Sequence, residues 1–286
     1  MDEINTTFSD QITQYAAAAY EANKPQEGDY IGSDGLIYCG KCNTPKQCRN
    51  VFCGREIINF CMCKCREEAI QRERERDEAQ QLEMMKARYR DECFITGSQY
   101  RDARFEDADD TPIICGAREY VKRFGEFQTA DKKGLMYYGT TGAGKSYAAA
   151  CIANALIDKG LPVIMTTMSR IANKLQSSFE GRNEYLDKLA TVSLLIIDDF
   201  YAERQTEFMA ETTFEVINAR CETRKPLIIT TNMTRQEMKK AQSDIRSDRL
   251  MSRISENCHL IECTGEDRRV KAGRASHEQY KAIYGV

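Results

Sequence analysis

The stretch that decides the fold is Leu135-Met136-Tyr137-Tyr138-Gly139-Thr140-Thr141-Gly142-Ala143-Gly144-Lys145-Ser146. Its apolar first part predicts a buried strand, and the alanine-rich run after Ser146 predicts a helix. Between the two, Gly139 and the triplet Gly144-Lys145-Ser146 fit the pattern G-x-x-x-x-G-K-[ST] of a phosphate-binding loop. Backbone N–H groups of such a loop converge on an anion, and the dipole of the following helix favours negative charge there. The stretch therefore predicts a nucleoside triphosphate site rather than a chance glycine-rich turn.

Two residues of this loop have expected chemical roles. Lys145 supplies a positive charge to the outer phosphates, and the Ser146 hydroxyl ligates Mg²⁺. The residues expected to contact the nucleotide are Gly139, Thr140, Thr141, Gly142, Ala143, Gly144, Lys145, Ser146 and Tyr147.

A second decisive stretch runs from Val192 to Phe200. Four consecutive aliphatic residues, 194–197, are typical of a strand buried on both faces of a parallel sheet. Ligands bind at the carboxyl ends of such strands. We therefore expect Asp198 to hold Mg²⁺ and Asp199 to polarise the attacking water.

Two further segments carry candidate catalytic groups. Residues 226–232 predict another buried strand, which ends in the polar side chain of Asn232. Asn232 is expected to reach the γ-phosphate or its water, and an ordinary turn asparagine is the alternative. Arg249 and Arg253 are four positions apart and so share a helix face. Either one is a candidate for an arginine finger that reaches the γ-phosphate of a neighbouring subunit.

The cysteines indicate a metal site. Seven of the 13 fall between Cys39 and Cys65. We expect no export signal, and the chain exceeds the small size typical of disulfide scaffolds, so clustered cysteines favour a metal over disulfides. Cys39 and Cys42 form a C-x-x-C turn, and a predicted hairpin over 47–58 separates them from Cys61-Met62-Cys63-Lys64-Cys65. Two of these three later cysteines would complete a tetrahedral Zn²⁺ site. Free thiols and an iron–sulfur cluster are the alternatives.

Composition sets the wider limits. The 286 residues are 42% hydrophobic and carry a net charge of −3, which favours a globular protein over one coated with basic residues. No apolar run reaches the length of a membrane helix, so we expect a soluble, intracellular protein without membrane contact.

Several other elements are predicted from pattern. Residues 66–90 are rich in Glu, Arg, Gln and Ala and predict a solvated linker helix, with a partner-binding helix as the alternative. Further helices are expected over 12–20, 117–124, 169–189 and 207–220, and further strands over 161–167 and 258–263. Four basic residues within 169–189 are candidates for nucleic-acid contact: Arg170, Lys174, Arg182 and Lys188. A solvated surface is the simpler interpretation.

Together these motifs resemble AAA+ ATPases of the DnaC/DnaI helicase-loader group and the related IstB transposition helper, over about residues 100–275. The resemblance rests on 139–146 as Walker A, 194–199 as Walker B, 230–232 as sensor 1 and 249–253 as the finger-bearing segment. Residues 265–269 resemble the segment of sensor 2, with Arg269 at the matching position. The residues 198–199 read Asp-Asp where many AAA+ families have Asp-Glu; in this group that is usual.

The resemblance implies an α/β fold: an AAA+ P-loop core with a parallel sheet flanked by helices, preceded by a small zinc-binding domain and a linker helix. The corresponding domains are a partner-binding zinc module over 1–65, a charged linker over 66–95 and an ATPase domain over 96–286. Similarity to loaders with Cys-x-x-Cys followed by Cys-x-Cys favours Cys63 and Cys65 over Cys61 as zinc ligands. It also implies side-by-side assembly in which Arg253 completes the neighbouring site.

The function implied is that of an ATP-hydrolysing helicase loader in DNA replication in the cytoplasm of a bacterium, encoded by the bacterium or a phage. Its cofactors would be ATP, Mg²⁺ and Zn²⁺, and its partners a replicative helicase and single-stranded DNA. An IstB-like helper of transposition and a zinc-stabilised adaptor that binds nucleotide without hydrolysis are the alternatives.

Overall fold

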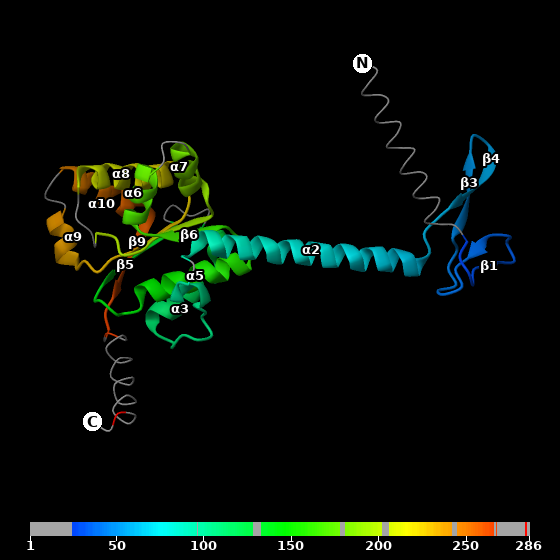
Figure 1. Cartoon of the computed structure of the whole chain (residues 1–286), viewed down its shortest axis with the longest axis horizontal. Coiled ribbons are helices and arrows are strands. Elements are labelled where there is room, and N and C mark those ends of the chain that lie inside the picture. The colour runs from blue at the N-terminus through cyan, green and yellow to red at the C-terminus, as the bar shows by residue number, and fades with distance from the viewer. Residues whose placement is uncertain are drawn as a thin grey trace, which may run out of the picture. The chain divides into compact units, whose positions relative to one another are not determined.

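The computed structural model describes residues 25–95, 97–127, 133–177, 181–201, 206–241, 245–265, 267 and 284. The chain divides into two compact units, Met1–Gln81 and Leu82–Val286 (Figure 1). The helix expected over 12–20 lies outside the described residues. In the part of the chain that the structure describes, no helix is long and apolar enough to span a bilayer.

The first unit contains two small antiparallel sheets. The strands β1 (Tyr30–Ile31) and β2 (Ile37–Tyr38) pair with each other, as do β3 (Gln47–Phe52) and β4 (Arg55–Phe60). Cys53 and Gly54 join β3 to β4, and both have positive φ, 50° and 75°, as a type I′ turn between twisted strands requires. The predicted hairpin is confirmed, and it extends two residues beyond 58.

The helix predicted over 66–90 is present as α2 (Lys64–Cys93). Charged side chains surround it, and Cys93 is its buried residue. Its last turns, from Leu82 onward, belong to the second unit, where Cys93 packs into the core. A helix this polar gains little from burial, so its stability depends on high helix propensity and on i,i+4 ion pairs such as Glu68–Arg72.

The second unit is built on a five-stranded parallel sheet in the order β6-β7-β8-β5-β9. Its strands are β5 (Gly134–Gly139), β6 (Val163–Thr166), β7 (Leu194–Ile197), β8 (Leu227–Thr230) and β9 (Cys258–Cys263). Since all five run the same way, their carboxyl ends meet at one edge, where an open α/β sheet binds its ligands.

Helices cover both faces of this sheet, as Figure 1 shows. Leu194 and Ile196 point into a core with α3 (Pro112–Lys122) and α5 (Lys145–Asp158). Leu195 and Ile197 point the other way, into a core with α6 (Met168–Ser177), α7 (Arg182–Thr191), α8 (Glu207–Glu222) and α10 (Ile245–Asn257). This alternation explains the uninterrupted aliphatic run, and the predicted parallel sheet flanked by helices is confirmed.

The remaining elements are short. A 3₁₀ turn, η1 (Gln99–Asp102), precedes α3, and α4 (Phe124–Phe127) follows it. The helix α9 (Arg235–Ala241) lies between β8 and α10.

A buried arginine connects elements around the core that α6, α7, α8 and α10 form with the sheet. Arg220, on α8, is 1% exposed, and burial lowers the pKa of its guanidinium to about 9. Its Nη1 donates to the backbone oxygens of Leu189, Ala190 and Val192, and its Nη2 donates to that of Pro226. One charged side chain therefore fixes the end of α7 against the starts of β7 and β8.

Three predicted boundaries were wrong. The helix expected over 169–189 is two helices, because Gly181 adopts φ 80° and starts α7. The strand expected over 161–167 is confined to β6, since Pro162 has no N–H to donate to a ladder. The helix expected over 117–124 starts earlier, at Pro112, where the fixed φ of proline favours a first helical residue.

Candidate nucleotide and metal sites

The phosphate loop connects β5 to α5. Gly139, Gly142 and Gly144 have φ values of 116°, 77° and 90°, which turn successive backbone N–H groups toward one side. At Gly139 a side chain is excluded, because a Cβ there would lie 2.6 Å from the backbone oxygen of Cys263. Thr140 donates its N–H to that same oxygen, at 3.1 Å, so β9 supports the loop.

Lys145 starts α5 and is 5% exposed. Its Nζ donates to the backbone oxygens of Gly139, at 3.0 Å, and Thr140, at 2.7 Å. The ammonium group is therefore held against the loop, which is the placement that a ligand for β- and γ-phosphates requires.

The two carboxylates after β7 occupy different environments. Asp198 is 7% exposed; burial raises the pKa of its carboxyl, whereas hydrogen bonds from Thr230 and Ser146 oppose that rise. The structure thus brings together Ser146 and Asp198, the two residues predicted to hold Mg²⁺. A hydroxyl and a carboxylate are oxygen ligands of the kind that Mg²⁺ prefers, so the donor set fits this ion.

Asp199 lies at the surface of the pocket. Its φ of 51° is left-handed, a conformation that aspartate tolerates better than most residues. Asp199 and Asn232 line the same pocket as Lys145 and Ser146. Both predicted water-positioning residues therefore lie in the cavity that the phosphate loop opens onto.

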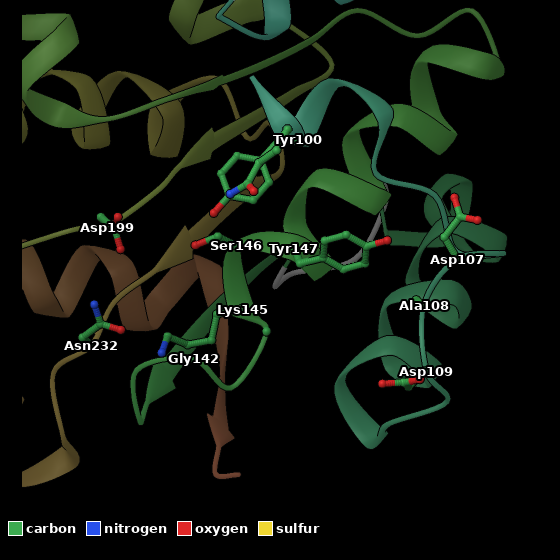
Figure 2. Close-up of a pocket in the computed structure, with 12 residues that line it drawn as sticks. Tyr100, Asp107, Ala108, Asp109, Gly142, Lys145, Ser146, Tyr147, Asp199 and Asn232 are labelled. Carbon is green, nitrogen blue, oxygen red and sulfur yellow. The ribbon is translucent and has the colours of Figure 1, made fainter. Parts of the chain in front are cut away.

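The pocket, of about 340 Å³, has a second wall that sequence reasoning missed except for Tyr147. In Figure 2, Ser146 and Lys145 lie between the pair Asp199 and Asn232 and the segment that carries Asp107 and Asp109. The residues of this second wall are Gln99, Tyr100, Asp107, Ala108, Asp109 and Tyr147. Aromatic rings and polar groups opposite a phosphate loop suit the base and ribose of a nucleotide.

The two candidate arginines lie elsewhere. Both Arg249 and Arg253 are exposed on α10, and neither lines this pocket. Arg253 Nη1 forms an ion pair with Glu256 at 3.4 Å. Arg269 lies outside the described residues.

In the first unit, four cysteines converge. The Sγ atoms of Cys39, Cys42, Cys63 and Cys65 all lie within 4.8 Å of one another. Two of the separations are 3.6 Å, from Cys39 to Cys65, and 3.5 Å, from Cys63 to Cys65. A tetrahedral site with Zn–S bonds of about 2.3 Å needs sulfurs about 3.8 Å apart, so these residues fit Zn²⁺.

Cys61, the third candidate in the second half of the motif, lies outside this group. Its Sγ contacts the backbone oxygen of Pro45 at 3.5 Å, and burial, followed by the nearby Cys48, raises the pKa of its thiol. The set that includes Cys63 and Cys65 is the one the geometry favours.

The thiols of this cluster have divergent acidities. Hydrogen bonds from Thr44 and from the Cys65 backbone lower the pKa of Cys42 to about 6. The neighbouring sulfurs raise the pKa of Cys65 to about 12, and that of Cys63 has the largest effect. Crowded sulfurs resist carrying several negative charges, and a divalent cation would remove that repulsion.

A buried ion pair supports the C-x-x-C turn. Asp29 accepts hydrogen bonds from the N–H groups of Gln26, at 2.7 Å, and Gly40, at 3.2 Å. It also accepts one from Lys46 Nζ at 2.6 Å, in a pair whose side chains are 6% and 4% exposed. These bonds lower the pKa of Asp29 to about 2, and the bond from the Gln26 N–H has the largest effect. The bond to Gly40 holds the turn that carries Cys39 and Cys42, and so orients two of the candidate metal ligands.

A parallel sheet with a phosphate loop after β5 and paired carboxylates after β7 defines an ATP-binding P-loop core of the AAA+ class. Within that class, the chain belongs to the family of IstB-like ATP binding proteins, whose model matches residues 67–276.

Similar proteins include replicative helicase loaders and an insertion sequence ATP-binding protein. The replicative helicase loader DnaI of Bacillus subtilis is 24% identical over 252 residues, covering 81% of this chain and 78% of DnaI. The loader DnaC of Escherichia coli K12 is 24% identical over 159 residues, covering 54% of this chain and 62% of DnaC. An insertion sequence ATP-binding protein of Sinorhizobium fredii is 32% identical over 129 residues, covering 43% of this chain and 42% of that protein. The chain is thus homologous to replicative helicase loaders and to an insertion sequence protein.

A crystal structure of DnaI is also similar, with a TM-score of 0.48 and 26% identity over 58% of this chain and 90% of that chain.

Proposed function

We propose that this protein is an ATP-hydrolysing helicase loader that delivers a replicative helicase to single-stranded DNA. The extent of the similarity to DnaI supports this most directly. It covers 81% of the chain, more than residues 96–286 alone can supply, so it reaches into the segment before the ATPase core. The similarity to the insertion sequence protein covers 43% of the chain.

The proposed ATPase roles follow from the pocket. Lys145 and the loop N–H groups bind the phosphates, and Ser146 and Asp198 hold Mg²⁺, which would offset the charge of the phosphates. Asp199 and Asn232 align a water with the γ-phosphate. Arg253 is proposed to complete the site of a neighbouring subunit, so that hydrolysis depends on assembly.

The proposed helicase-binding part is the zinc module over 1–65, ahead of the linker over 66–95. Its β3–β4 hairpin exposes large apolar side chains: Val51 is 75% exposed, Phe52 70% and Ile58 52%. Exposed apolar side chains gathered on one small hairpin are typical of a protein-binding surface.

Single-stranded DNA is the proposed second partner, and a groove on α6 and α7 supports it. Lys174, Arg182, Tyr185 and Lys188 line this groove. Lys174 Nζ lies 4.0 Å from the centre of the Tyr185 ring. Cations beside an aromatic ring suit phosphates and stacked bases.

Co-purification with the host's replicative helicase tests the proposal. Full-length protein should retain the helicase, and Phe52→Ser should weaken retention at least tenfold, because it removes an exposed apolar contact. Phe214→Ser is a matched control, since Phe214 is 40% exposed on α8 in the second unit. If full-length protein does not bind the helicase but hydrolyses ATP when duplex DNA is present, the IstB-like transposition helper becomes the better interpretation.

A further inference from the structure

We propose that Thr230 is a positioning residue that fixes both carboxylates of the nucleotide site through a single hydroxyl group. This inference rests on the proposed ATPase function. Thr230 ends β8, next to the strand that carries Asp198 and Asp199, and it is 0% exposed.

The geometry around this hydroxyl is specific. Thr230 Oγ1 donates to Oδ1 of Asp198 at 2.5 Å. The same Oγ1 accepts the backbone N–H of Asp199 at 3.0 Å. Phe200 then donates its N–H to the Thr230 backbone oxygen at 2.8 Å, so three successive residues after β7 are tied to one residue of β8.

A hydroxyl suits this position because it donates and accepts at the same atom. Donation to Asp198 favours the carboxylate form and fixes the orientation of this carboxyl group, which also accepts a hydrogen bond from Ser146. Acceptance from Asp199 N–H fixes the left-handed turn at φ 51°, from which Asp199 faces the pocket. A valine side chain has the shape of threonine but makes neither bond.

The adjacent residue, Thr231, makes different hydrogen bonds. Thr231 Oγ1 donates to the backbone oxygen of Phe200 at 2.7 Å and accepts the N–H of Met233 at 3.2 Å. The two threonines before Asn232 are therefore not equivalent, and of the two hydroxyls that of Thr230 is the one that contacts a carboxylate.

Four side chains at position 230 isolate the contribution of the hydroxyl. Threonine and serine carry it, whereas valine and alanine do not. The wild type is therefore compared with Thr230→Val, and Thr230→Ser is compared with Thr230→Ala. Thr212→Val is the matched control, because Thr212 is 1% exposed and its Oγ1 is a buried atom without a hydrogen-bond partner among the described residues.

The first readout is hydrogen exchange of the Asp199 amide in nucleotide-free protein. Thr230→Val and Thr230→Ala should accelerate it at least tenfold, whereas Thr230→Ser and Thr212→Val should leave it unchanged. The second readout is the Mg²⁺ concentration that half-saturates nucleotide binding. It should rise about 10–100-fold in Thr230→Val and Thr230→Ala, the usual effect of losing a group that orients a metal ligand, with Mg²⁺-free nucleotide affinity unchanged.

Unchanged Asp199 exchange in both hydroxyl-free variants would overturn the proposal, as would equal behaviour of Thr230→Ser and Thr230→Ala. The exchange measurement needs no nucleotide, so it decides the role of Thr230 even if wild-type protein fails to bind ATP. That failure would overturn the proposed function instead.

Discussion

Asn154 donates from Nδ2 to the backbone oxygen of Tyr100 at 2.9 Å, across 54 positions of the chain. The same Nδ2 reaches the backbone oxygen of Ala103 at 3.0 Å, and Asn154 is 0% exposed. Because Asn154 lies on the helix that begins at Lys145, one helix both presents the phosphate loop and holds the opposite wall of the pocket.

Replacing this anchor should weaken nucleotide binding without touching the phosphate loop. Asn154→Ala removes one of two donors from each backbone oxygen: Tyr100 O keeps the Ala103 N–H at 3.3 Å, and Ala103 O keeps Arg104 Nη1 at 3.1 Å. Each lost hydrogen bond contributes about 0.5–1.5 kcal/mol. We expect nucleotide affinity to fall about tenfold in equilibrium titrations. Asn218→Ala, on α8, where the side chain contacts Glu222, should change nothing. Equal affinities for wild type and Asn154→Ala would show that this wall does not contact the nucleotide.

Replacing Asp199, the carboxylate exposed to the pocket, should abolish ATP hydrolysis without abolishing ATP binding. Asp199→Asn removes the charge proposed to polarise water while keeping the size of the side chain, so we expect ATP hydrolysis to fall at least 100-fold. ATP affinity should stay within about threefold, because Lys145 and Ser146 are unchanged. Hydrolysis in the wild type that disappears in this variant would exclude a non-hydrolysing adaptor. Wild-type protein without turnover in the presence of helicase and DNA would favour the adaptor.

The parts of the site that sequence predicts are those that one short segment encodes. Gly139 to Ser146 specify their own geometry through glycine conformations and a helix start, so the loop is readable before any tertiary contact is known. Asp198 and Asp199 are readable for a similar reason, since a fully aliphatic strand indicates which end of the sheet its polar residues occupy.

The rest depends on packing between distant segments. Gln99, Tyr100 and Asp107 have no motif; they reach the pocket because Asn154 and the core under α3 hold that segment there. A sequence signal for this wall is Asn154 itself, the polar residue within the apolar run 148–157 of α5. Thr230 is similar, because its two bonds to the residues after β7 exist only when β7 and β8 are adjacent.

Metal content should depend on four cysteines and not on a fifth. Purified protein should hold about one zinc ion per chain by elemental analysis, and Cys39→Ser or Cys65→Ser should abolish it. Cys61→Ser is the matched control, since its sulfur lies outside the cluster, and it should keep the zinc. Chelation should raise hydrogen exchange over residues 36–66 and leave the ATPase core unchanged. Unaltered exchange there on chelation would refute a structural metal.

Binding of single-stranded DNA should require the groove on α6 and α7. Tyr185→Ala should reduce affinity about tenfold, because stacking on an aromatic ring contributes about 1–3 kcal/mol per base. Lys174→Ala should lower the slope of log affinity against log salt by about 1, the effect of losing one phosphate contact. Arg123→Ala, on the loop after α3, serves as a control for general charge loss. Fluorescence anisotropy with a labelled oligonucleotide measures both quantities, and unchanged values would place the DNA elsewhere.

The position of the exposed arginines on α10 predicts that ATP hydrolysis requires assembly of neighbouring copies. Arg253 lies outside the pocket that Lys145 lines, so a role in hydrolysis requires that it reach the pocket of a neighbouring copy. Arg253→Ala should then lose hydrolysis about 10³-fold or more, the usual contribution of an arginine finger, while binding ATP normally.

The decisive form of this experiment mixes two inactive proteins. In a mixed assembly, Arg253→Ala chains supply an intact phosphate site, and Lys145→Ala chains supply the missing guanidinium, so part of the activity should return. Arg249→Ala, tested in the same way, identifies which arginine acts, because only the variant that lacks the finger can be complemented by Lys145→Ala chains. If neither mixture recovers activity above that of its separate components, the site is complete within one chain and α10 has another role.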